Sequence, residues 1–129
     1  MSRTRTLAVS AVLTLAGLAL AACGKPGVEA PTDVGVCYAM AAQDDGTYKF
    51  NVVARNMPNI ENCAAQLEGM RLRFLRMGGQ TKELMGSYQG SFIMLRRDGI
   101  YRAQKWGGAE YIMLVRSGDG RLIQPGAVQ

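Results

Sequence analysis

Hydrophobic residues recur at two different spacings along this chain, and the change of spacing predicts its secondary structure. Residues 34–41 form an apolar run, which predicts a buried strand. Residues 48–54 alternate between apolar and polar types, which predicts a half-exposed strand. Its apolar face is expected to carry Tyr48, Phe50, Val52 and Ala54. Between the two segments, Asp45-Gly46 is typical of a tight turn, so a hairpin is expected.

After Pro58 the apolar residues recur every three or four positions, which is the period of an amphipathic helix. The stripe consists of Ile60, Cys63, Ala64, Leu67, Met70, Phe74 and Leu75. Gly78-Gly79 predicts the end of this helix. A second interpretation ends the helix at Gly69 and makes the residues after it a strand. We favour one long helix, because the apolar stripe continues through Gly69.

Short apolar runs separated by glycine-containing turns fill the rest of the chain. They predict strands at residues 83–89, 91–95, 100–105, 109–116 and 121–124. Regular turn signals between short strands are typical of an antiparallel meander. The predicted fold class is therefore α+β: an N-terminal β-hairpin, one amphipathic helix and then an antiparallel β-meander, with the helix stripe buried on one face of the sheet.

The N-terminal segment has a different composition. Residues 1–6 are basic, residues 7–20 are almost entirely apolar, and Leu20-Ala21-Ala22 stands directly before Cys23. The apolar run is shorter than the roughly 20 residues that span a bilayer. The segment resembles the signal peptide of bacterial prolipoproteins, in which a lipobox of one aliphatic and two small residues precedes a cysteine.

This resemblance implies that residues 1–22 are removed, that Cys23 carries a diacylglyceryl group on its sulfur, and that its new amino group is acylated, for example by palmitate. Residues 23–33 would then be the lipidated cysteine and a flexible tether, and residues 34–129 a small α+β domain. Gly24 favours the outer membrane, with the domain facing the periplasm. A short transmembrane anchor and an ordinary signal peptide cut near Ala21 remain alternatives.

The formal net charge is +5, and two of the arginines belong to the predicted signal peptide. The remaining charge is uneven, because residues 28–68 hold six acids and two bases, whereas residues 69–105 hold eight bases and two acids. A basic second half suits anionic partners such as lipid headgroups, lipopolysaccharide phosphates or an acidic protein, and it also suits an ordinary solvated surface.

The sequence has no histidine, which removes the most frequent general base near neutral pH and the most frequent metal ligand. In an exported domain, Cys37 and Cys63 are expected to form a disulfide between the first strand and the helix. Two buried free thiols are the alternative. The pair Asp44-Asp45 is typical of a hairpin turn. No catalytic residue, metal site or cofactor is therefore expected.

Basic residues supply the better binding candidates. On a helix, Arg73 and Arg76 are neighbours that can hold one anionic group between them. The candidate residues for binding an anion or a partner are Arg73, Arg76, Arg96, Arg97 and Arg102. Tyr101 and Trp106 follow the second group, an interleaving similar in composition to surfaces that bind glycans or nucleic acids. The alternative is that these aromatic residues fill the core and its rim.

These observations predict a bacterial envelope lipoprotein that acts as a non-enzymatic binding or assembly module, held at the membrane by the lipid on Cys23. The expected partners are the membrane and an anionic headgroup, a glycan or an envelope protein, whereas the compartment argues against nucleic acid. One alternative is a carboxylate-dependent enzyme acting on envelope glycans, which needs two carboxylates facing each other across a cleft. Another is a structural subunit of an envelope complex, which would expose an apolar patch.

Overall fold

The structure is a computed structural model that describes residues 27–79 and 83–126, so the predicted signal peptide and Cys23 lie outside the described residues. Within these ranges the elements are Cys37–Ala42 (β1), Tyr48–Ala54 (β2), Ile60–Arg76 (α1), Leu84–Tyr88 (β3), Ser91–Arg96 (β4), Gly99–Ala103 (β5), Glu110–Arg116 (β6) and Leu122–Ile123 (β7). The strands form an antiparallel sheet in the order β2-β1-β3-β4-β5-β6-β7. The predicted α+β class, with a hairpin, a helix and a meander, is confirmed.

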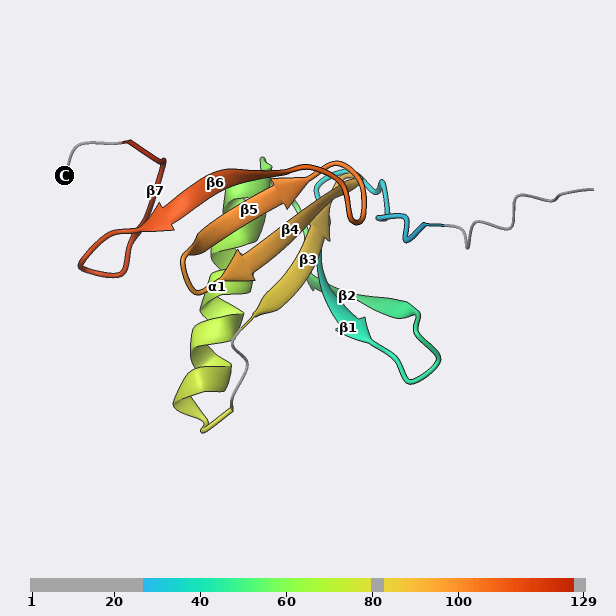
Figure 1. The fold of residues 1–129 in the computed structure, drawn as a ribbon, viewed down its shortest axis with the longest axis horizontal. Helices are drawn as coiled ribbons and strands as arrows, with labels where there is room; N and C mark the ends of the chain where they lie inside the picture. The colour runs from blue at the N-terminus through green and yellow to red at the C-terminus, as the bar shows by residue number, and fades with distance from the viewer. Residues whose placement is uncertain (1–26, 80–82, 127–129) are drawn as a thin grey trace, which may run out of the picture.

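The helix α1 connects the two parts of the sheet. It follows the edge strand β2 in the chain and precedes β3. Strand β3 pairs with β1, on the side of β1 away from β2. Figure 1 shows α1 crossing one face of strands β3 to β6, while the β1–β2 hairpin diverges from them at the other end of the sheet. The C-terminal half of α1 runs past the edge of these strands.

One continuous helix forms over the whole apolar stripe. Asn59 caps its N-terminus, because the side-chain Oδ1 accepts a hydrogen bond of 2.9 Å from the backbone N–H of Asn62. The buried positions follow the helical period as far as Arg71. Gly69 lies inside the helix, so the interpretation that ended the helix there and continued as a strand is wrong.

The main core lies between α1 and the sheet. Its buried side chains are Cys37, Ala39, Ile60, Cys63, Ala64, Leu67, Leu84, Tyr88, Ile93, Leu95, Ile100 and Leu114. Helix and sheet approach closely at Gly86 of β3, where a Cβ atom would lie 2.4 Å from Cδ1 of Leu67 and 2.5 Å from the carbonyl oxygen of Tyr38. Only glycine therefore allows α1 to lie this close to β3.

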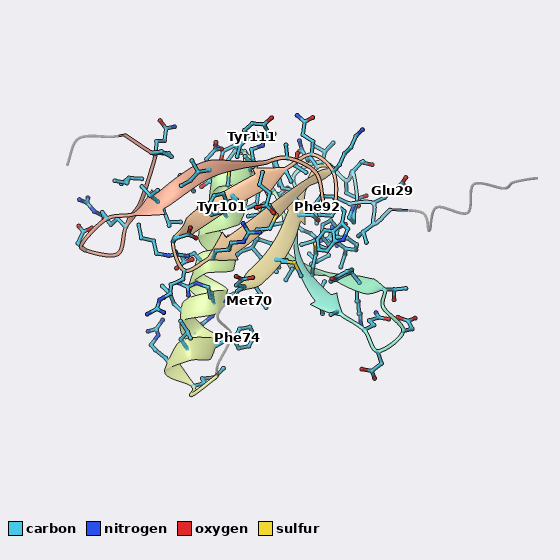
Figure 2. All side chains as sticks on the ribbon, in the orientation of Figure 1. Glu29, Met70, Phe74, Phe92, Tyr101 and Tyr111 are labelled. Atoms are coloured by element: carbon cyan, nitrogen blue, oxygen red, sulfur yellow. A yellow bond between two sulfur atoms is a disulfide. The ribbon has the colours of Figure 1, made fainter. Side chains whose placement is uncertain are left out.

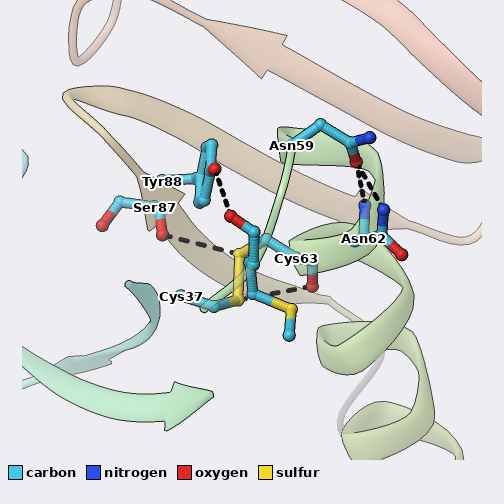
Figure 3. The surroundings of a disulfide bond; sticks show 7 residues. Cys37, Asn59, Asn62, Cys63, Ser87 and Tyr88 are labelled. Atoms are coloured by element: carbon cyan, nitrogen blue, oxygen red, sulfur yellow. Dashed lines mark hydrogen bonds between the residues drawn. A yellow bond between two sulfur atoms is a disulfide. The ribbon is translucent and has the colours of Figure 1, made fainter. Parts of the chain in front are cut away.

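A disulfide links Cys37 of β1 to Cys63 of α1, with their Cα atoms 5.3 Å apart (Figure 3). Both cysteines are fully buried. The predicted disulfide is confirmed, and the alternative of two free thiols is wrong. Beside it, the hydroxyl of Tyr88 donates a hydrogen bond of 2.7 Å to the carbonyl of Met57, which ties the segment before α1 to β3.

Strand β2 departs from the predicted alternation at a bulge. The pairing with β1 places Tyr38 opposite Val52 and Cys37 opposite Ala54, so that Val53 is skipped. As a result, Val53 and Ala54 pack against the main core, whereas Val52 is 47% exposed. Val52 still shares a face with Tyr48 and Phe50, because the pairing is regular up to Val52, but the expectation that Ala54 lies on that face is wrong.

A second, smaller core covers the sheet face opposite α1. Its buried residues are Met40, Phe92, Met94 and Ala103, and the partly buried residues around them are Val28, Ala30, Tyr48, Phe50, Met85, Tyr101 and Trp106. The segment expected to be a tether up to Asp33 contributes to this core through Val28 and Ala30. It is also held by a hydrogen bond of 2.9 Å from the Gly90 N–H to the Pro31 carbonyl. Residues 28–33 thus lie against the domain.

The buried residues of the described chain all fall between Gly35 and Ser117. A soluble form that covers residues 24–129 therefore keeps both cores and the disulfide, and it lacks Cys23. This form is suited to experiments on the domain in isolation.

Candidate functional site

The five candidate arginines lie in three places. Arg73 and Arg76 lie in the last turn of α1, Arg96 ends β4 and Arg97 begins the following turn, and Arg102 lies on β5. Arg96 shares the face of β4 that carries Phe92 and Met94, whereas Arg102 alternates with Tyr101 and shares the opposite face with Ile100. The structure therefore does not bring the five onto one surface.

Arg96 is engaged with a carboxylate on β6, which is separated from β4 by strand β5. Its guanidinium donates two hydrogen bonds to Glu110 of β6, one of them 2.8 Å long, and it lies 5.2 Å from the centre of the Tyr101 ring. The hydrogen bond from Arg96 lowers the pKa of the Glu110 carboxyl. An arginine in such a bidentate pair has fewer free donors for a partner.

A buried network joins α1 to β6, and it was not predicted from the sequence. Glu68 accepts hydrogen bonds of 2.9 and 3.2 Å from Arg71 on the same helix. It accepts two more, of 2.9 and 2.7 Å, from Arg116 at the end of β6. Glu68 and Arg71 are both more than 90% buried. The three-residue spacing of Glu68 and Arg71 on a helix could have indicated their ion pair. The contact with Arg116 could not be found in this way, because Arg116 lies on a strand that is distant in the sequence.

The remaining helical arginines flank an apolar groove at the C-terminal end of α1. This groove has a volume of about 590 Å³ and is lined by Val52, Val53, Met70, Arg73, Phe74, Arg76 and Met77. We call it the helix-end groove. Figure 2 shows Met70 and Phe74 projecting from α1 in this part of the molecule. The groove therefore lies between the end of the helix and the bulged edge strand β2.

Apolar side chains are unusually exposed around the helix-end groove. Met77 and Val52, which line the groove, are 74% and 47% exposed. Leu72 and Leu75 are also exposed, elsewhere on the same part of α1. The reason is local: the buried positions of α1 end at Arg71, and the last turn extends beyond the strands. Gly78 has a φ of 81°, a left-handed conformation that ends the helix directly after this turn.

Arg73 and Arg76 have no carboxylate partner within 4.0 Å in the part of the chain that the structure describes, where the paired arginines are Arg71, Arg96, Arg116 and Arg121. Both lie in the last turn of the helix, where the carbonyl end of the dipole favours a cation. Two unpaired guanidinium groups beside exposed apolar side chains suit a ligand that has both an anionic group and hydrocarbon.

A second hollow lies on the opposite face of the sheet. It has a volume of about 310 Å³ and is lined by Met85, Phe92, Met94, Arg96, Ala103, Lys105, Trp106, Gly107 and Glu110. The Trp106 ring is 5.4 Å from that of Phe92 and 4.8 Å from that of Tyr48, between ring centres. This hollow was not predicted from the sequence, because its walls come from strands whose register is set by long-range pairing.

Asp45, one of the two adjacent acids of the β1–β2 turn, has a local hydrogen-bond partner. Asp45 accepts hydrogen bonds from the backbone and hydroxyl of Thr47 in the β1–β2 turn, as expected for a hairpin.

Among the residues described, no three His, Cys, Asp or Glu side chains are grouped in a way that would hold a metal ion. In these segments α1 is too short and too polar to cross a membrane.

Comparison with known proteins adds no relative from which a function could be carried over. No protein-family model matches the chain, and neither the curated proteins nor the solved structures gave a match. Function is therefore argued from the residues of this chain alone. The helix-end groove and the hollow beside Trp106 are the two candidate sites.

Proposed function

We propose that this chain is a bacterial envelope lipoprotein, anchored by lipid on Cys23, and that its domain is a non-enzymatic binding module for an anionic lipid surface. The observation that carries the proposal is the last turn of α1, where Arg73 and Arg76 have no carboxylate partner among the residues that the structure describes and stand beside exposed apolar side chains. The localisation rests on the lipobox resemblance of residues 20–23.

The chemistry of this turn matches a bilayer surface. Guanidinium groups bind phosphates well, and each basic residue near an anionic membrane contributes about 1 kcal/mol. Arg73, Arg76 and Met77 lie three and four positions apart, so they project from one side of the helix. The flexible Met77 side chain is suited to enter the irregular boundary between headgroups and acyl chains.

The proposed anchor and the helix end act together. Val28, the first residue that packs on the sheet, follows Cys23 by five residues. A chain of that length spans at most about 18 Å, so the lipid on Cys23 holds the domain against the bilayer. A second, weaker contact through the helix end then fixes the orientation of the domain.

Vesicle binding of the soluble form of residues 24–129 tests the proposal without the anchor. We expect it to sediment with vesicles that contain phosphatidylglycerol and to stay in solution with pure phosphatidylcholine. Arg73→Glu/Arg76→Glu should lower the affinity by roughly tenfold or more. The matched control is Lys49→Glu/Lys105→Glu, which changes the net charge equally on the hairpin and on the β5–β6 turn, and it should bind like the wild type.

Two results would overturn the proposal. One is a folded wild-type domain that does not bind anionic vesicles at low salt, where surface attraction is strongest. The other is an equal loss of binding in both charge-reversed variants, because net charge rather than the helix-end groove would then account for the attraction.

A further inference from the structure

Three methionines lie side by side on the sheet face opposite α1. Met40 of β1 is the direct cross-strand partner of Met85 on β3, and Met85 is the direct partner of Met94 on β4. Phe50 and Tyr101 continue the row at its two ends. Directly opposed residues have Cβ atoms about 5 Å apart and point to the same face of the sheet. The three thioether side chains are thus neighbours on adjacent strands.

Trp106 belongs to the same site. The hollow of about 310 Å³ described above is lined by Met85, Met94 and Trp106 together. Met40 and Met94 are buried, and Met85 is partly buried. The charge of Arg96, which lines the hollow, is neutralised by its pair with Glu110. Lys105 also lines the hollow. The site is therefore apolar and rich in sulfur, and an aromatic ring stands at its edge.

We propose that Met40, Met85 and Met94 bind a soft monovalent cation, Cu(I) or Ag(I), through their thioether sulfurs, with the indole of Trp106 beside the ion. Thioethers are soft ligands that select Cu(I) over hard cations such as Mg²⁺ or Ca²⁺. An indole ring attracts a nearby cation through its negative face, and this attraction is stronger where water is excluded. The site is independent of the helix-end groove and of its proposed lipid partner.

Methionine is also a common filler of irregular cores, so packing and metal binding must be separated. Leucine substitutes for methionine at nearly constant volume and costs little stability, but it has no sulfur. Met→Leu variants therefore keep the packing and remove the ligand. Other strong soft ligands do not interfere, since the sequence has no histidine, Cys37 and Cys63 form the disulfide, and the soluble form lacks Cys23.

Silver nitrate titrated into the soluble form of residues 24–129 in chloride-free buffer is the test. Ag(I) needs no reductant, so the disulfide stays intact. Trp106 is the only tryptophan of the chain, so its fluorescence reports on this site alone. We expect a change that saturates at one Ag(I) per domain. In the wild type, the methyl NMR signals of Met40, Met85 and Met94 should shift with the same stoichiometry.

The matched variants are Met85→Leu/Met94→Leu in the site and Met57→Leu/Met70→Leu on the helix side of the sheet. The first should lower Ag(I) affinity by roughly tenfold or more, and the second should leave it unchanged. The proposal is overturned if the wild type shows no saturable change, if the site variant binds as tightly as the wild type, or if the signals of Met57 and Met70 shift instead. The wild-type methyl spectrum decides the matter even if a variant fails to fold.

Discussion

Arg116 at the end of β6 donates two hydrogen bonds to the buried carboxylate of Glu68 on α1, at 2.9 and 2.7 Å. A third hydrogen bond, of 2.7 Å, runs from Arg116 to the backbone carbonyl of Arg96. One side chain therefore links the helix, the end of β4 and β6. The disulfide fastens α1 to β1, and this network fastens it to the other half of the sheet.

The Glu68 network predicts a stability change in acid. Burial alone would raise the pKa of Glu68, but the hydrogen bonds and charges of Arg116 and Arg71 outweigh it and hold the pKa at about 2, below the usual 4.5. Because the folded pKa is the lower one, this stabilisation is complete above about pH 4.5 and is lost as the pH falls through 2. We expect Glu68 to account for about 3 kcal/mol of unfolding free energy between about pH 6 and 2, measured by urea denaturation.

Glu68→Gln isolates that contribution. The variant should unfold with about 3 kcal/mol less free energy at neutral pH, because two arginines lose their charged partner, and it should show a weaker dependence on acid. Glu83→Gln, at an exposed position before β3, should differ from the wild type by less than about 0.5 kcal/mol. If Glu68→Gln keeps the full acid dependence of the wild type, the network is not its source.

Removal of the disulfide should weaken the attachment of α1 to β1. We expect the double variant Cys37→Ala/Cys63→Ala to lose about 3 kcal/mol of unfolding free energy, since the link closes a loop between residues 26 positions apart. Wild-type protein with its disulfide reduced should show a similar loss in thermal denaturation. A double variant as stable as the oxidised wild type would mean that the packing of α1 alone holds the helix in place.

Two glycines are expected to respond in opposite directions to the same substitution. Gly69 lies inside α1 with open space where a methyl group would project, so Gly69→Ala should raise the unfolding free energy by up to about 1 kcal/mol. Gly86→Ala should lower it by about 3 kcal/mol or more, because the methyl group would clash with Leu67 and with the Tyr38 carbonyl. Equal effects in chemical denaturation would show that α1 does not pack closely on β3.

The proposed anchor has its own test. In cells fed a palmitate analogue, the wild-type chain should be labelled and should fractionate with membranes. Cys23→Ser should remove the label, because the sulfur that receives the diacylglyceryl group is missing. The chain should then not be processed as a lipoprotein. Equal labelling of the two forms would contradict lipidation at Cys23.

Much of the fold follows from local pattern. The helical period from Ile60 and the turn signals of the second half predict the helix and the order of the strands after it, because both depend on neighbours in the sequence. The bulge at Val53 was not predictable in this way, since it depends on pairing with β1. Val28 and Ala30 were assigned to a tether because of the surrounding prolines and glycines, yet they cover the second core.

The candidate site was only partly predictable for the same reason. Helical spacing placed Arg73 and Arg76 together correctly, because both lie on one element. The faces of Arg96 and Arg102 depend on which side of the sheet α1 covers, and that is a property of the whole fold. The methionine row likewise exists only through the register of three strands, and no spacing in the sequence indicates it.

The most direct test of the lipid-surface proposal places an environment-sensitive fluorophore at the helix end. In the soluble form of residues 24–129, Met77→Cys supplies one free thiol for the label, and Lys105→Cys supplies the control on the β5–β6 turn. With phosphatidylglycerol vesicles, we expect the emission of the Met77 label to shift to the blue and that of the Lys105 label to stay unchanged. An unshifted Met77 label on vesicle-bound protein would contradict the proposal that the helix end enters the bilayer surface.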